Sequence, residues 1–349
     1  MRRATRAAGG PAVAVAALAA LAAACGEGNA PEPVPRSHAC VEPGAGGQAA
    51  VPWERLRNPV YELPDAAVKD VAVRLVDGRW RLLFSHVRED PFRFRIGLAS
   101  SADLLSWSGV ELWDQPEVGG VASPDVTRHR SGTYIVTYNS HTRDVDGLNK
   151  LYVRTSTDFR TWSPPERLAF DVRPLPADRL IDAALAHTPA GLVLGYNHQE
   201  DRFEVAVSPR GTLDGPWRRV GVADTGPFEN YQFLQIDGVW HVLGTTVPVH
   251  RTLLYRIGGP PGDPDSWRRW RLVREITVPD QGWNRPAGEV LNAAYLCDAR
   301  ALDGHWYLFY AGSTELDRFG GRGHAKMGVA RSPDLVRWEV PPPRSAPSP

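Results

Sequence analysis

Residues 67–86, AVKDVAVRLVDGRWRLLFSH, decide the fold of this chain. Two apolar runs flank Asp77-Gly78. An Asp-Gly pair between such runs is typical of a tight hairpin turn, because both central residues need a positive φ angle. One acid, Asp70, stands where the first run begins. The stretch therefore predicts two antiparallel strands with a carboxylate at the start of the first.

The same pattern recurs four more times along the chain. The later hairpins start at Asp125, Asp182, Asn230 and Asn292, successive starts lie 48 to 62 residues apart, and each of the five turns carries a glycine. Repeats of about this length with several strands each are typical of propeller blades. The sequence therefore predicts an all-β chain folded as a five-bladed β-propeller. A further strand follows each hairpin and ends in an Asp-containing turn and a tryptophan, which we expect to pack between sheets: Trp107, Trp162, Trp217, Trp267 and Trp338.

The first 25 residues have the features of a secretion signal. Arginines precede an apolar run over residues 12–24, which is too short to span a membrane, and Cys25 stands where a bacterial lipoprotein signal carries its lipid-modified cysteine. Ordinary secretion, with Cys25 in the discarded peptide, is the alternative. We expect a signal peptide over 1–25, a flexible tether over 26–51, the propeller over 52–341 and a disordered tail over 342–349. The protein is then extracytoplasmic, either lipid-anchored to the cell membrane or secreted.

Composition and the absence of several motifs argue against some classes of function. Lys+Arg and Asp+Glu both number 40, so the net charge is zero, and no basic stripe suggests binding to nucleic acid. The sequence contains no glycine-rich phosphate loop, HExxH motif, C-x-x-C pair or nucleophile elbow. In an oxidising compartment Cys40 and Cys297 either pair, which would tie the ring closed, or remain two unrelated thiols.

Carboxylates recur at the starts of the predicted inner strands, which converge on one mouth of a propeller's channel. Asp70, Asp125 and Asp182 are expected there at one register, with Glu229 immediately before Asn230. Such residues can serve simply as turn formers. Several acids around one funnel repel one another, however, and this favours a chemical role. Glycoside hydrolysis suits the set, because it needs one carboxylic acid for the leaving oxygen and one carboxylate for water or direct attack.

Several of these stretches resemble the five-bladed propeller glycosidases of glycoside hydrolase families 43 and 62. VKDVAVRLVDGRWRLLFS is similar to the stretch that carries the catalytic base, which implies that role for Asp70. LIDAAL (180–185) is similar to the family stretch whose aspartate orients the general acid and tunes its pKa, which implies that role for Asp182. PFENYQFLQIDGVWHVL (227–243) resembles the stretch that carries the general acid itself, which implies that role for Glu229. SPDV resembles a signature whose Asp is structural or lines the pocket, so Asp125 is expected to contact substrate. The resemblance covers essentially the whole predicted propeller, although each motif is short.

The chain also departs from the family pattern. Val71 and Ala183 follow the two aspartates where family 43 often has proline. The histidine that many of these enzymes carry in the fifth blade has no clear counterpart, which leaves a structural calcium open and allows Glu289 as a competing acid. Family precedent implies an inverting reaction, for which the two carboxyls should lie about 6.5–9.5 Å apart.

Further candidates for sugar binding come from the ends of the returning strands and from aromatic residues. Imidazole and amide groups there could bind sugar hydroxyls, and aromatic rings could stack on a sugar, although loop exposure and blade packing are the plainer roles. The candidates are His86, Asn139, His141, Asn197, His198, Tyr231, Trp283 and Tyr295.

Together with the acids at the strand starts, the resemblance implies an inverting glycoside hydrolase that cleaves α-L-arabinofuranosidic or β-xylosidic bonds in plant-type polysaccharides. We expect a monomer that needs no organic cofactor and meets a membrane only through its lipid anchor. Two alternatives stay open: a propeller that binds glycans without cleaving them, and a propeller glycosidase that acts on another glycan.

Overall fold

The computed structural model describes residues 40–41, 51–141, 150–168, 170, 180–198, 202–247, 249–284, 292–315, 318–321 and 325–342. The chain divides into two compact units, Met1–Pro35 and Arg36–Pro349, and the described residues all belong to the second. The expected signal peptide with Cys25 lies outside the described residues, as do most of the tether and of the tail. Within the described part of the chain, no helix is both long and apolar enough to cross a membrane.

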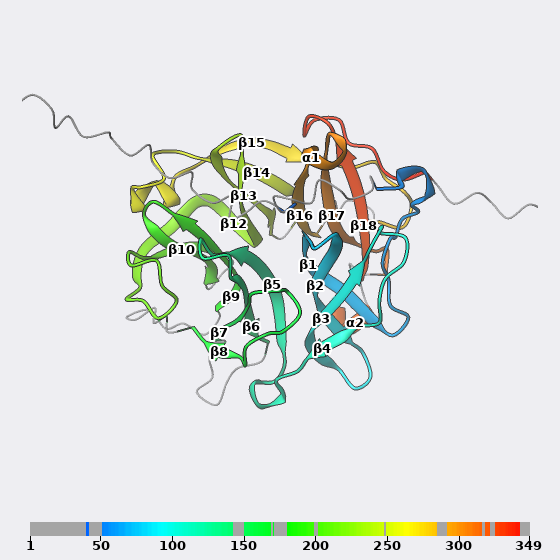
Figure 1. Ribbon diagram of the computed structural model, residues 1–349, viewed down its shortest axis with the longest axis horizontal. Helices are drawn as coiled ribbons and strands as arrows, with labels where there is room; N and C mark the ends of the chain where they lie inside the picture. Colours follow the sequence, from blue (N-terminus) through cyan, green and yellow to red (C-terminus); the bar gives the residue numbers. More distant parts are fainter. Residues whose placement is uncertain are drawn as a thin grey trace, which may run out of the picture. The chain divides into compact units, whose positions relative to one another are not determined.

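The structure is all-β, as the sequence predicts, and its main strands form four antiparallel sheets (Figure 1). The first sheet contains β1 (Ala66–Val76), β2 (Arg79–Arg88), β3 (Arg93–Ser101) and β4 (Glu111–Trp113). The second contains β5 (Val121–Arg128), β6 (Tyr134–Ser140), β7 (Leu151–Ser156) and β8 (Glu166–Arg167). The third contains β9 (Leu180–Thr188), β10 (Gly191–His198), β11 (Arg202–Ser208), β12 (Arg218–Ile236), β13 (Val239–Thr246), β14 (Thr252–Ile257) and β15 (Trp270–Ile276). The fourth contains β16 (Asn292–Ala299), β17 (His305–Gly312) and β18 (Lys326–Ser332).

The helices of the described residues are short, and all except η1, which precedes β1, lie in connections between these strands. They are η1 (Trp53–Arg55), η2 (Pro116–Val118), η3 (Pro264–Arg268), α1 (Arg300–Asp303) and α2 (Arg318–Gly321).

The five predicted hairpins are present as β1–β2, β5–β6, β9–β10, β12–β13 and β16–β17. Their turn glycines all have positive φ angles, from 70° at Gly78 to 114° at Gly191, where a residue with a Cβ would be strained. Asp77 and Asp237 are also left-handed, so both central residues of the first and fourth turns have the geometry that an Asp-Gly pair favours.

The first strands of the five hairpins lie side by side around the middle of the unit (Figure 1). β1 packs on β5, β5 on β9, β9 on β12, β12 on β16, and β16 on β1. β12 is long because its beginning pairs with β11 and its end with β13, which joins two hairpin units into the seven-stranded sheet. The first strands of all five hairpins are therefore brought close to one another.

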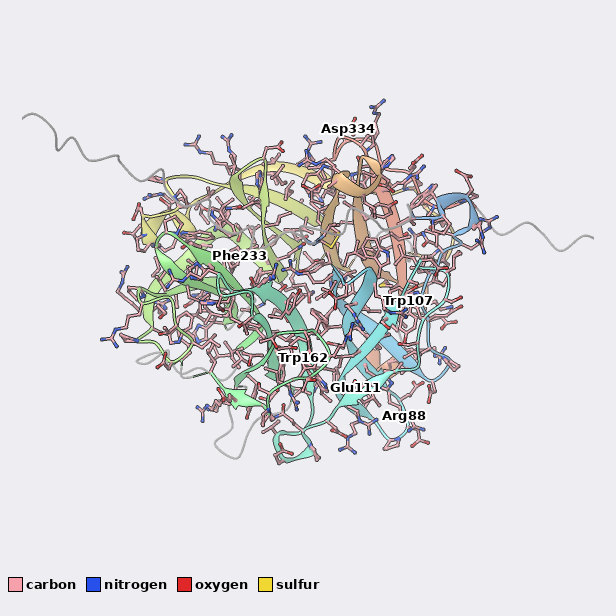
Figure 2. The ribbon with its side chains drawn as sticks, in the orientation of Figure 1. Arg88, Trp107, Glu111, Trp162, Phe233 and Asp334 are labelled. Carbon is pink, nitrogen blue, oxygen red and sulfur yellow. A yellow bond between two sulfur atoms is a disulfide. The ribbon has the colours of Figure 1, made fainter. Side chains whose placement is uncertain are left out.

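The recurring Asp and Trp of the outer turns are structural. Ser101 and Asp103 accept backbone N–H groups of the turn after β3, and Ser156 and Asp158 do the same after β7. These turns place Trp107 and Trp162 against a hydrophobic cluster that the first, second and fourth sheets share (Figure 2). The other three tryptophans of the repeat pack against further clusters of the core: Trp217, Trp267 and Trp338.

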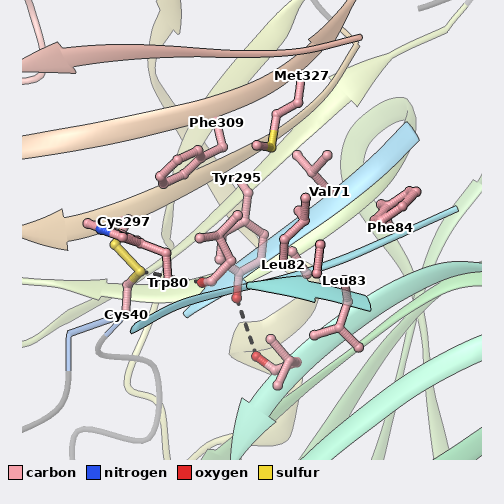
Figure 3. Close-up of a cluster of buried hydrophobic side chains, with 14 of the residues drawn as sticks. Cys40, Val71, Trp80, Leu82, Leu83, Phe84, Tyr295, Cys297, Phe309 and Met327 are labelled. Carbon is pink, nitrogen blue, oxygen red and sulfur yellow. Dashed lines mark hydrogen bonds between the residues drawn. A yellow bond between two sulfur atoms is a disulfide. The ribbon is translucent and has the colours of Figure 1, made fainter. Parts of the chain in front are cut away.

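A disulfide joins the beginning of the described chain to the last sheet (Figure 3). Cys40 is bonded to Cys297 of β16, and both are buried. The next residue, Val41, forms a parallel bridge with Leu75 of β1, and the Leu75 N–H donates to the Cys40 carbonyl at 2.8 Å. The pairing that the sequence left open therefore connects the last sheet to the first.

Residues that precede β1 reinforce this connection. The Asn58 side chain bonds both backbone groups of Val329 in β18, at 2.8 and 2.9 Å, and Tyr61 bridges Met327 in the same strand. The beginning of the chain thus adds backbone pairing to the outer strand of the last sheet.

We expect Cys297→Ser to lower the free energy of unfolding by about 2–4 kcal/mol, because the cross-link joins residues 257 apart in the sequence and so restricts the unfolded chain. Urea unfolding of the oxidised protein measures this effect. Cys40→Ser should give the same loss, and the double variant should lose no more than either. Additive losses would show that the two cysteines stabilise the fold independently.

Candidate functional site

Each first strand carries a β-bulge close to where its pairing with the second strand of the hairpin begins. The register shifts between Lys69 and Ala72 in β1, and it shifts at the corresponding places in β5, β9, β12 and β16. Within four of these bulges one non-glycine residue is left-handed, with φ between 49° and 55°: Asp70, Ser123, Asp182 and Asn230. Such a conformation costs on the order of 1 kcal/mol or more for a residue with a Cβ, and it is concentrated at functional sites.

The bulges correct one expectation. Asp70 and Asp182 occupy equivalent positions, but Asp125 does not share their register. Ser123 is the left-handed residue of β5, and Asp125 follows two residues later, where the strand has resumed its normal pairing opposite Thr137. Asp125 therefore lies further along its strand than the other two aspartates.

One cavity unites the five bulges. Its lining comes from all five first strands and comprises Asp70, Val71, Ser123, Pro124, Asp125, Asp182, Ala183, Asn230, Tyr231, Ala294 and Tyr295. Two of the three predicted catalytic residues, Asp70 and Asp182, thus face the same space. The third, Glu229, immediately precedes a lining residue.

Side chains of one sheet accept hydrogen bonds from the bulge amides of the next sheet, that is, from the backbone N–H groups of its left-handed bulge residues. Ser85 of β2 accepts the Ser123 N–H at 2.7 Å and donates its hydroxyl to Asp70 Oδ2 at 2.6 Å. Asn139 Oδ1 of β6 accepts the Asp182 N–H at 3.2 Å. These bonds fix the relative positions of neighbouring first strands at the cavity.

Asp182 makes the corresponding bond to the fourth hairpin. Its Oδ2 accepts the Asn230 N–H at 3.2 Å, and its side chain is buried. Because Asn230 directly follows Glu229, the Asp182 carboxylate fixes the backbone from which the Glu229 side chain extends.

Glu229 is partly exposed and lies beside a histidine that the sequence did not suggest. His250 Nε2 is 3.9 Å from Glu229 Oε1, and the two side chains are 21% and 17% exposed. His250 belongs to the connection between β13 and β14, so no strand pattern pointed to it. The imidazole of His250 is thus a neighbour of the predicted acid.

Asp125 is buried beside Arg74, which is only 2% exposed. Backbone N–H groups of Val126 and Leu185 bond its carboxyl. Burial is the largest influence and raises the pKa of Asp125 to about 7, although the Arg74 charge and these hydrogen bonds act in the opposite direction. A carboxyl of this kind is partly protonated near neutral pH.

The raised pKa of Asp125 has a consequence for stability. Between the usual carboxyl pKa of 3.8 and about 7, the folded state retains a proton that the unfolded state has lost. Stability therefore falls as the pH rises through this window, by at most about 1.4 kcal/mol per pH unit. We expect the unfolding free energy of the wild type to decrease relative to that of Asp125→Asn between pH 4 and pH 7, as measured by urea unfolding. Parallel curves for the two proteins would contradict the assignment.

Two predicted amide ligands of sugar are instead bonded within the protein. Asn139 is buried, with Oδ1 accepting the Asp182 N–H and Nδ2 donating to the Ser140 carbonyl, and its role as a sugar ligand stays a prediction. Asn197 is also buried, and its Nδ2 lies 3.5 Å from the Phe228 carbonyl that it faces.

Two predicted aromatic ligands do line the cavity, but their hydroxyls bond the backbone. Tyr231 donates to the Phe228 carbonyl, and its ring stacks on Phe203. Tyr295 donates to the Val126 carbonyl at 3.3 Å. Both tyrosines therefore form part of the cavity wall.

Three further predicted ligands lie outside the cavity lining. His86 is buried, and burial together with the Arg95 charge lowers its pKa. His141 stacks on Phe94, and Trp283 stacks on Tyr310 against the core cluster of the fourth sheet. The rings of His141 and Trp283 are therefore occupied by packing within the protein.

His198 belongs to a buried ionic network that the sequence did not reveal. Its Nδ1 lies 3.2 Å from Glu204 Oε1, and Arg219 bonds both oxygens of the same carboxylate at 2.7 and 2.8 Å. Tyr196 donates its hydroxyl to Glu204 at 2.9 Å. Glu204 and His198 stand six residues apart across the β10–β11 pair, so only the strand register could have linked them.

The described residues offer no group of three or more His, Cys, Asp or Glu side chains placed to hold a metal ion. Glu289, the competing acid, lies outside the described residues.

Comparison with known proteins places the fold. No protein-family profile matches this chain, and no curated protein matches it. Among solved structures, an α-L-arabinofuranosidase from Podospora anserina in complex with cellotriose has a TM-score of 0.61 at 12% identity, over 82% of this chain and 96% of that one. The catalytic domain of a GH62 α-L-arabinofuranosidase from Coprinopsis cinerea has a TM-score of 0.59 at 14% identity, over 78% and 94%.

A third structure comes from work on the GH130 family of mannoside phosphorylases, which contains glycoside hydrolases that target β-1,2 mannosidic linkages in Candida mannan. It has a TM-score of 0.56 at 15% identity, over 84% of this chain and 97% of that one. At such identities the similarity shows a shared fold. The chain thus has a fold found among glycoside hydrolases of different specificities.

Proposed function

We propose that this protein is an inverting glycoside hydrolase built on a five-bladed β-propeller. The closed succession of contacts among five first strands supports the blade count. One observation carries the function: Asp70 and Asp182 stand at equivalent left-handed bulges around one cavity, and the Asp182 carboxylate holds the amide next to Glu229. Left-handed aspartates alone would be explained by strand geometry. A base at the cavity and an acid whose backbone a third carboxylate positions are what a glycosidase requires.

Each carboxylate takes a distinct part in the proposed reaction. A water molecule attacks the anomeric carbon and gives a proton to Asp70, while the glycosidic C–O bond breaks and its oxygen takes a proton from Glu229. Asp182 positions the backbone of the acid through the Asn230 amide. The product is a free sugar of inverted anomeric configuration, and water is the only co-reactant.

We propose α-L-arabinofuranosides or β-xylosides as the substrates, on the sequence resemblance and on the fold shared with arabinofuranosidases. The second candidate is hydrolysis of another glycan, which the fold shared with the GH130 structure favours. A panel of arabinan, arabinoxylan, xylan, β-mannan and small aryl glycosides separates the two.

We expect Asp70→Asn and Glu229→Gln each to lower the rate of sugar release by about 10²–10⁴-fold on the best substrate of this panel, because each removes a proton-transfer group. Glu111→Gln is the matched control, since Glu111 is an exposed carboxylate of the outer strand β4 (Figure 2). Thermal unfolding should show that all three variants fold. Unchanged sugar release by either site variant would exclude its proposed role.

A further inference from the structure

Ser85 is a buried hydroxyl placed between two groups of the cavity. It lies in β2 with no exposed surface, and its Oγ donates to Asp70 Oδ2 at 2.6 Å while accepting the Ser123 N–H at 2.7 Å. Asp70 and Ser123 are the left-handed residues of β1 and β5. A single side chain therefore ties the carboxylate of one strand to the bulge of the next.

The two bonds determine the direction of the hydroxyl proton. A backbone N–H can only donate, so the bond from Ser123 engages a lone pair of Ser85 Oγ. The hydroxyl proton of Ser85 is then directed to the carboxylate, and each bond polarises the other. Asp70 Oδ2 is held by this chain of hydrogen bonds, which distinguishes it from Oδ1.

The corresponding positions of the next two hairpins show what is particular about a serine here. Ser85 pairs with Lys69, just before the bulge, and the equivalent residues are Asn139 in β6 and Asn197 in β10. Asn139 accepts the next bulge amide, but its Nδ2 donates to the Ser140 carbonyl. Asn197 stands at the third position, but the N–H of the next bulge residue, Asn230, donates to Asp182 Oδ2 and not to Asn197. Of these three residues, only Ser85 both accepts a bulge amide and donates to a carboxylate.

We propose that Ser85 is a positioning residue for the catalytic base. It fixes Asp70 Oδ2, so that Oδ1 is the oxygen that receives the proton of the attacking water. It also couples the base to the second hairpin, because the same hydroxyl holds the Ser123 amide. This inference rests on the proposed function and assigns Ser85 a part in the same site.

Substitution of Ser85 in the full chain tests the inference. We expect Ser85→Ala to lower kcat on the best substrate by about 10- to 100-fold with little change in KM, because the carboxylate loses its fixed orientation while sugar contacts remain. Ser85→Thr keeps the hydroxyl and should restore most of kcat. Hydrogen exchange at the Ser123 amide should be faster in Ser85→Ala than in the wild type and Ser85→Thr.

Ser101→Ala is the matched control. Ser101 is equally buried in the same sheet, and its hydroxyl accepts the Leu104 N–H at 2.8 Å, but it is remote from Asp70 in the strand order. Its kcat should match that of the wild type even if its melting temperature falls as much as that of Ser85→Ala.

Two outcomes would overturn the inference in different ways. An active wild type with an equally active Ser85→Ala would exclude the positioning role and leave the proposed hydrolysis intact. A wild type that releases no sugar from any glycan of the panel would overturn the proposed function and the role of Ser85 with it.

Discussion

Hydrogen bonds from side chains of one hairpin to the backbone N–H of the bulge residue in the next hairpin are the interactions on which the site depends. A regularly paired strand has no spare amide at its start, whereas a bulge leaves one residue outside the ladder and frees its N–H for another partner. The side chains of Ser85, Asn139 and Asp182 accept such an N–H from the first strand of the second, third and fourth hairpins, respectively. The cost of the left-handed residues is offset where such bonds hold them in place. The proposed catalytic carboxylates and the register of neighbouring hairpins are thus fixed by the same contacts.

The ring of strands also needs its two ends joined. The chain runs directly from each hairpin to the next through the intervening strands, whereas the last sheet and the first lie at opposite ends of the described chain. The disulfide from Cys40 to Cys297, the bridge from Val41 to Leu75 and the pairing of Asn58 with Val329 make that connection through residues that precede β1. A shift of the fourth sheet relative to the first would open the same cavity that the five strands line.

The sequence predicted the features that depend on neighbouring residues. Asp-Gly turns and glycines with positive φ gave the hairpins, and the acids at the starts of strands led to Asp70 and Asp182. The register of Asp125 was wrong, because a bulge adds a residue that apolar alternation does not reveal, and Ser123 takes the equivalent place. Asn139 was predicted to bind sugar because it ends a strand. The sequence did not reveal that its Oδ1 accepts the N–H of Asp182, which is 43 residues further along the chain. Ser85 and His250 acquire importance only from partners that are distant in the sequence.

The central claim is that the bulges of the first strands bring a base, Asp70, and an acid, Glu229, to opposite sides of a glycosidic bond. A crystal structure of the Glu229→Gln variant with a bound oligosaccharide from the best substrate tests it most directly. The account predicts a sugar ring among the bulges of the five first strands, with its anomeric carbon between the Asp70 carboxylate and the side chain at position 229. The ends of these two side chains should lie about 6.5–9.5 Å apart. An oligosaccharide bound elsewhere on the protein, or side chains too far apart to reach one bond, would contradict it.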